Sequence, residues 1–288
     1  MFGGKGGVGK TTCAAAAALH SAREGERTLV ISTDPTPSLA DIFELEPEGN
    51  PTEVAENLYL AELGQGEIRE LWERKFGHEV YEVFSGFVDI EYEEFVKFIT
   101  SILPGLGEEF MVDYIRELAR SGLYERIIWD TAPLGQTLEL LRMPSLLRGH
   151  LRAAPKIYSR LKLGGRSRRS VLEILRGWEE LSGEDIAFLK GEVELVMVTI
   201  PEALAVRQLE AVFAELTRYG LRPRRLIINN VIQKIDSPFL RQKAREQRGY
   251  LDLLRRSYRD LEPLELPLFP HEIKGLARLG EVEEVLFA

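Results

Sequence analysis

Cysteine is almost absent from this chain: Cys13 is the single thiol among 288 residues. One thiol per chain excludes an internal disulfide framework, a zinc site built from several cysteines and an iron–sulfur cluster ligated within one protomer. The sequence also lacks any run of about 18 apolar residues, so we expect no transmembrane segment. Its first residues lack the long apolar stretch of a secretory signal, and we therefore expect a cytoplasmic location.

The chain also carries fewer positive than negative charges. The chain has 37 Lys and Arg against 46 Asp and Glu, a formal net charge of −9, which argues against nucleic acid as a partner. Basic residues gather at residues 164–169 (GGRSRR), where we expect a loop. That loop either meets an acidic partner or anionic lipid, or is simply solvated.

Short apolar runs alternate with helical stretches along much of the chain. This pattern predicts an α/β fold, a mostly parallel sheet covered by helices on both faces. Only two residues precede the glycine-rich turn that starts at Gly3, so we expect either a very short first strand or a native start further upstream. Later strands are predicted at 28–32, 126–129, 194–199 and 225–229, and helices at 10–24, 111–120 and 203–219.

Two stretches, 67–103 and 145–190, interrupt this alternation and look purely helical. We interpret them as helical insertions, at about 64–110 and 145–190, in a single domain that spans residues 1–288. Their apolar residues recur at helical spacing, which suits either core packing or an apolar groove.

Residues 4–11 read GKGGVGKT and match the phosphate-binding pattern G-x-x-x-x-G-K-[ST]. Glycines let backbone N–H groups surround phosphates, and the helix that follows adds the positive end of its dipole. Lys10 is expected to reach the β- and γ-phosphates, and the Thr11 hydroxyl to bind Mg²⁺. The predicted nucleotide-binding residues of this segment are Gly4, Gly6, Gly7, Val8, Gly9, Lys10, Thr11 and Thr12.

Lys5 adds a second lysine near the front of the same loop. A lysine at the outer edge of the loop can reach across a dimer to the nucleotide bound by the partner. The alternative is a solvated loop lysine without a role.

Three aspartates follow predicted strands. Asp34 and Asp41 lie after the strand 28–32, where they suit contact with a metal-bound water and polarisation of the attacking water; Asp41 alternatively caps a short helix. Asp130 ends the strand at 126–129, an arrangement that places a carboxylate beside Mg²⁺. The predicted metal-binding residues are therefore Thr11, Asp34 and Asp130.

These segments together resemble the arsenical-pump and tail-anchored-protein-targeting ATPases, a branch of the P-loop ATPases with an extra lysine in the loop. The resemblance covers nearly the whole chain. The segments that carry it are GGKGGVGKTT at 3–12, STDP at 32–35, SLAD at 38–41, DTAPLGQT at 130–137, PG at 104–105, IPE at 200–202, INN at 228–230 and PHEIKG at 270–275.

The resemblance implies a homodimer that binds ATP and Mg²⁺ and hydrolyses ATP. It places the water-activating carboxylate at Asp41 and the partner-directed lysine at Lys5. It also places adenine contacts at Asn229, which otherwise reads as a strand-end turn residue. A loop after residue 267 supplies the other adenine contacts, from Pro270, His271, Glu272 and Ile273.

The chain departs from the family pattern at positions that bear on metal binding. Ser237 and Leu240 stand where the targeting branch carries two zinc-binding cysteines, so no zinc is expected, and Gln136 stands where the family has histidine. The thiols that bind arsenicals are missing too. The function expected is handling of an apolar helical client or a membrane-associated partner. The alternatives are a motor for arsenite or anion efflux and a nucleotide-switched scaffold with little turnover.

Overall fold

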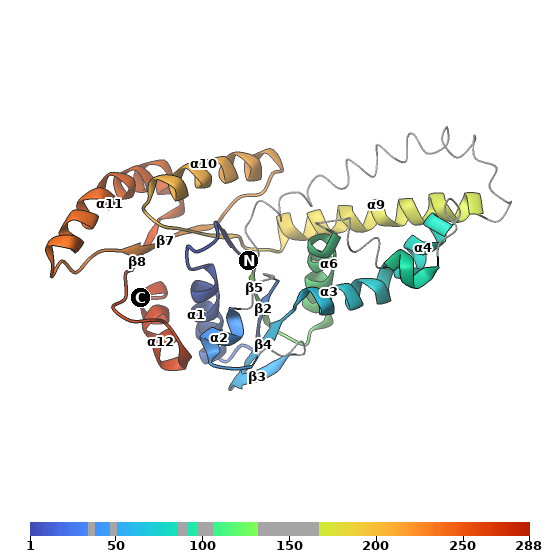
Figure 1. Cartoon of the computed structure of the whole chain (residues 1–288), viewed down its shortest axis with the longest axis horizontal. Coiled ribbons are helices and arrows are strands. Elements are labelled where there is room, and N and C mark those ends of the chain that lie inside the picture. The colour runs from blue at the N-terminus through green and yellow to red at the C-terminus, as the bar shows by residue number, and fades with distance from the viewer. Residues whose placement is uncertain (34–37, 47–50, 86–90, 97–105, 132–166) are drawn as a thin grey trace. The chain divides into compact units, whose positions relative to one another are not determined.

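The computed structural model describes residues 1–33, 38–46, 51–85, 91–96, 106–131 and 167–288 (Figure 1). The chain divides into two compact units. The first, here called the sheet unit, comprises residues 1–64, 118–135 and 193–288. The second, the helical unit, comprises residues 65–117 and 136–192.

The sheet unit is built on one eight-stranded sheet with the order β3-β4-β2-β5-β1-β6-β7-β8. All neighbouring strands run parallel except β3 and β4, which are antiparallel. The predicted α/β class with a mostly parallel sheet is confirmed. The strands are β1 Phe2–Gly4, β2 Thr28–Ser32, β3 Thr52–Ala55, β4 Leu58–Glu62, β5 Arg126–Asp130, β6 Val196–Thr199, β7 Arg225–Val231 and β8 Leu264–Pro267.

Helices cover both faces of this sheet. Figure 1 shows α1 and α12 on one face and α10 and α11 on the other. Alanines fill the middle of α1, and because alanine has no side chain beyond Cβ the helix packs closely on the strands and on α12. The helices are α1 Lys10–Arg23, α2 Leu39–Phe43, α10 Ala203–Arg218, α11 Pro238–Ser257 and α12 Gly275–Leu286, with a 3-10 turn at Arg259–Leu261.

Local patterns predicted some elements and missed others. The strand at 28–32 is found as predicted, whereas the strand expected from residue 194 begins at Val196. Strands β3, β4 and β8 were not predicted. β3 and β8 are edge strands of four residues, most of them half-buried, and such short segments carry little periodicity.

The helical unit contains helices and no strand among its described residues, as predicted, while residues 86–90, 97–103 and 145–166 of the two predicted stretches lie outside the described part. The described helices are α3 Gln65–Trp72, a π-helical turn Glu73–Gly77, α4 His78–Ser85, a helical turn at 92–96, most of α6 Leu106–Ser121, and α9 Ser167–Gly191. The loop expected at 164–169 is partly wrong, because residues from Ser167 onward begin α9; residues 164–166 lie outside the described part. No helix that the structure describes is long and apolar enough to span a bilayer.

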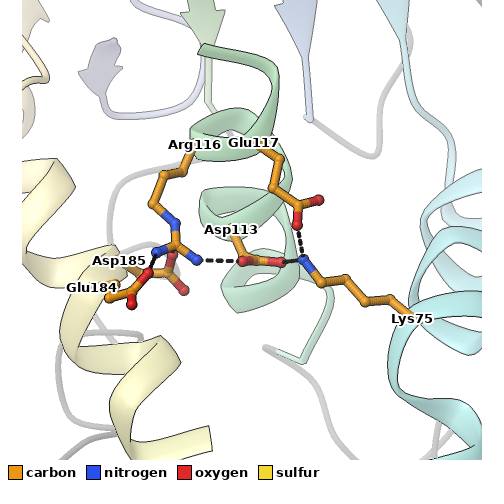
Figure 2. Close-up of polar contacts among 6 residues, drawn as sticks. All are labelled: Lys75, Asp113, Arg116, Glu117, Glu184 and Asp185. Carbon is orange, nitrogen blue, oxygen red and sulfur yellow. Dashed lines mark hydrogen bonds and ion pairs between the residues drawn. The ribbon is translucent and has the colours of Figure 1, made fainter. Parts of the chain in front are cut away.

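A buried network of ion pairs joins three segments of the helical unit (Figure 2). Arg116 of α6 pairs with Asp113 on its own helix at 2.7 Å and with Asp185 of α9 at 3.0 Å. Asp113 also pairs with Lys75 of the π-helical turn. The side chains of Asp113, Arg116 and Asp185 are only 2%, 4% and 7% exposed. Two exposed glutamates complete the network: Figure 2 shows Glu184 paired with Arg116 and Glu117 paired with Lys75.

Candidate functional site

The phosphate-binding pattern forms the connection between β1 and α1. Gly9 is the N-cap of α1 with a φ of 91°, and no side chain caps the helix. Its first N–H groups are therefore available to an anion, which is the arrangement expected for phosphate. Lys10 is 5% exposed, and its ammonium group donates a hydrogen bond to the carbonyl of Lys5 at 3.2 Å. The ammonium group thus lies against the loop in which it is predicted to bind phosphate.

Two glycines of this loop lie too close to other residues to carry a side chain. A Cβ on Gly4 would lie 2.3 Å from the carbonyl oxygen of Val198, and one on Gly9 would lie 2.2 Å from Nδ2 of Asn229. That Asn229 amide donates to the Val8 carbonyl at 2.9 Å. Asn229 lies inside β7 and packs directly against the phosphate loop, so it is not a turn residue at the end of a strand.

Asp130 is the last residue of β5, which lies between β1 and β2 in the sheet. It pairs in register with Phe2 on one side and Ser32 on the other, and its residue is fully buried. The Ser32 hydroxyl donates to one Asp130 oxygen at 3.3 Å. Ligands of parallel α/β sheets bind beyond the carboxyl ends of the strands, where Asp130 and the phosphate loop both lie.

Two of the three predicted magnesium ligands lie among the described residues. Thr11 and Asp130 present a hydroxyl and a carboxylate, which are oxygen donors of the kind that Mg²⁺ prefers. The hydroxyl of Thr11 lies 3.4 Å from that of Ser38. Asp34 lies outside the described residues, and within the described ranges no three His, Cys, Asp or Glu side chains form a metal-binding group.

Asp41 lies in the first turn of α2 and is exposed. The N-cap position belongs to Ser38, so the alternative interpretation of Asp41 as a helix cap is wrong. Among the described residues the Asp41 carboxylate accepts no hydrogen bond. It is therefore available for other chemistry.

Glu62, a residue that sequence reasoning missed, holds the start of α2. Its carboxylate accepts hydrogen bonds from the backbone N–H groups of Ser38, Leu39 and Ala40 at 2.8, 3.0 and 3.2 Å. The available signal was an acidic residue ending an apolar segment, LYLAE, but β4 itself was not predicted.

The segment after β8 lies at the same edge of the sheet as Asn229. The N–H of Leu268 donates to the Val231 carbonyl at 2.9 Å, which fastens the start of this loop to the end of β7. Within the loop, His271 Nε2 lies 3.2 Å from Glu281 Oε2. The remaining predicted adenine contacts are Pro270 and Glu272, which are exposed, and Ile273, which is half-buried against the core.

Lys5 differs from Lys10 in its surroundings. Its side chain is exposed and makes no hydrogen bond or ion pair with the described residues of its own chain. Gln136 and the rest of the segment 132–137 lie outside the described residues. Ser237, at the first of the two expected cysteine positions, is the N-cap of α11 and accepts a hydrogen bond from the N–H of Leu240 at 3.2 Å.

Comparison with known proteins gives a consistent result over the whole chain. The sequence profile of a family described as "Anion-transporting ATPase" matches residues 1–288. "Putative arsenical pump-driving ATPase 2" of Aquifex aeolicus is 29% identical, with 99% of this chain and 98% of that protein aligned. "ATPase GET3A" of Arabidopsis thaliana is 30% identical over 97% of this chain and 80% of its own length. "ATPase GET3" of Podospora anserina is 28% identical over 99% and 89%.

Proposed function

The chain belongs to the anion-transporting ATPase family, and from that premise we propose that it works as a cytoplasmic homodimer that couples ATP hydrolysis to handling of an apolar helical client or a membrane-associated partner. The protein is an ATPase, as are the relatives described above. The observation that supports a dimer is the exposed ammonium group of Lys5, which has no partner among the described residues of its own chain. The helical unit is then a pair of insertions, at about 64–110 and 145–190, in one ATPase domain.

The phosphate loop binds the nucleotide. Backbone N–H groups at the start of α1 and the ammonium group of Lys10 hold the β- and γ-phosphates. Thr11, Asp34 and Asp130 hold Mg²⁺, which when bound supplies positive charge to those phosphates. Asn229 and the loop 268–273, fastened to the same edge of the sheet, hold the adenine.

Asp41 orients the water that attacks the γ-phosphate. Its position supports this role, because its carboxylate is exposed and accepts no hydrogen bond from the described residues. The partner's Lys5 then neutralises charge that develops on the transferred phosphoryl group, as an arginine finger does in other ATPases. Each site is complete only when two chains meet.

Client handling belongs to the helical unit. Its described helices carry buried apolar residues, including Trp72 on α3, Val80 on α4 and Phe95 on the turn at 92–96. The resemblance to the targeting branch supports this assignment. The presence of Lys5, Asp34, Asp41 and Asp130 in the sequence supports turnover over a scaffold.

An Asp41→Asn variant tests the proposed function. It is expected to bind MgATP normally and to hydrolyse it about a hundredfold more slowly, because removing a positioned proton acceptor costs that order of rate. The ATP-loaded variant should then retain clients in a pull-down, and mass spectrometry should find proteins with apolar C-terminal segments. Normal hydrolysis would remove Asp41 from its role. Capture of a membrane pump subunit would favour efflux instead.

The efflux alternative requires thiols that bind arsenite, and Cys13 does not suit that chemistry. It is fully buried, and burial together with the charge of Asp130 raises its pKa to about 12, so the thiol stays protonated at neutral pH. We expect arsenite and zinc chelators to leave the ATPase rate unchanged. We also expect no reaction of Cys13 with Ellman's reagent at pH 8 until the protein is unfolded. Stimulation by arsenite, or one zinc per dimer by elemental analysis, would contradict this.

A further inference from the structure

We infer that Glu62 is a positioning residue of the ATPase: its buried carboxylate fixes the backbone of Ser38–Ala40 and so leaves the carboxylate of Asp41 free to act on water. The inference rests on the role of Asp41 proposed above. Glu62 itself contacts neither nucleotide nor water in this scheme. It acts through the segment that carries Asp41.

Glu62 is rigidly placed. It is the last residue of β4, which pairs in parallel with β2 so that Glu62 lies opposite Ser32. The residue is 5% exposed. One carboxylate oxygen accepts two N–H groups, at 2.8 and 3.0 Å, and the other accepts a third at 3.2 Å. Three N–H groups that a helix start leaves without helical partners are thereby satisfied by one side chain.

This arrangement explains why Asp41 is free. An acidic residue three positions after the N-cap ordinarily turns back to accept the N–H of the cap residue, as in a capping box. Asp41 holds that position relative to Ser38, and Glu62 already occupies the Ser38 N–H. Glu62 therefore accepts the N–H that Asp41 would accept in a capping box, and the Asp41 carboxylate has no backbone group to bind.

The fixed segment also adjoins the predicted magnesium ligands. The Ser38 hydroxyl lies 3.4 Å from that of Thr11. On the other side of Glu62, its register partner Ser32 donates to Asp130 at 3.3 Å. A shift of Ser38–Ala40 would thus move Asp41 relative to the phosphate loop. Displacements of about 1 Å at such positions can cost roughly a hundredfold in rate.

A Glu62→Gln variant tests the inference, because it keeps the shape of the side chain and replaces one acceptor oxygen with an N–H₂ donor. That donor would face a backbone N–H, so one anchor of α2 is lost. We expect kcat to fall about tenfold and KM for MgATP to stay within about twofold, since the phosphate loop is untouched. Glu62→Asp, which keeps both acceptors on a shorter chain, should recover part of the rate. Glu53→Gln, an exposed glutamate on β3, is the matched control and should behave as the wild type.

A double variant separates positioning from a general loss of fold. If Glu62 acts through Asp41, then Glu62→Gln combined with Asp41→Asn should be no slower than Asp41→Asn alone. Independent, multiplied losses would overturn the inference, as would an unchanged kcat in Glu62→Gln or a raised KM alone. Failure of the proposed function looks different: Asp41→Asn would then hydrolyse ATP normally, whatever Glu62→Gln does.

Discussion

The Lys5→Ala variant is expected to lose about a thousandfold in ATP turnover while its affinity for MgATP changes by less than about twofold. A cation supplied across an interface to the transferred phosphoryl group is worth roughly that much in other nucleotide hydrolases. Binding is spared because Lys10 and the backbone of the loop hold the phosphates within each chain. Steady-state hydrolysis and equilibrium binding of a fluorescent ATP analogue measure the two effects separately.

Mixing two inactive proteins decides whether Lys5 works across the dimer. In a heterodimer of Lys5→Ala with Asp41→Asn, one site combines an intact Asp41 with an intact lysine from the partner. That site should regain activity, up to about half of the wild-type rate per dimer. If Lys5 acts on the nucleotide of its own chain, both sites stay defective and mixing restores nothing. Lys234→Ala, which removes another exposed lysine, is the control and should be fully active.

The parts of the site that could be predicted from the sequence are contiguous in the chain. The phosphate loop, the segment with Asp41 and the strand that ends in Asp130 each carry their pattern within about ten residues. β2 is buried along its whole length, and both β2 and β5 carry three consecutive apolar residues at their centre, LVI and IIW, which makes them easy to recognise.

The parts that could not be predicted depend on partners far apart in the chain. The Asn229 amide binds the Val8 carbonyl across 221 positions, and Glu62 binds the start of α2 from a strand that begins well after it. Nothing in the local sequence distinguishes Glu62 from a solvated glutamate. The contact exists because β4 pairs with β2 in one register, and register is a property of the folded sheet.

The buried network of the helical unit was missed for the same reason, and it carries the second large effect. Arg116→Ala is expected to lower the free energy of unfolding by about 3–5 kcal/mol, the usual cost of breaking a buried ion pair by removing one partner. Burial alone would lower the pKa of Arg116, but Asp113, Asp185 and Glu184 raise it overall, so the guanidinium group stays charged. Its removal takes the guanidinium group away from the buried carboxylates of Asp113 and Asp185, and Lys75 is then the cation that remains paired with Asp113 among the described residues.

Arg126 provides the matched control for Arg116. Its guanidinium group forms two hydrogen bonds with Glu26, at 2.7 and 2.9 Å, but the two side chains are 50% and 33% exposed. Water screens such a pair, so Arg126→Ala should cost about 1 kcal/mol or less. Urea unfolding measures both losses, and hydrogen exchange should show the Arg116→Ala loss first in α6 and α9. Equal destabilisation by the two variants would mean that burial does not make the ion pairs of Arg116 more stabilising than an exposed pair. A larger loss for Arg116→Ala, confined to the helices it joins, would mean that this one side chain holds α6 to α9.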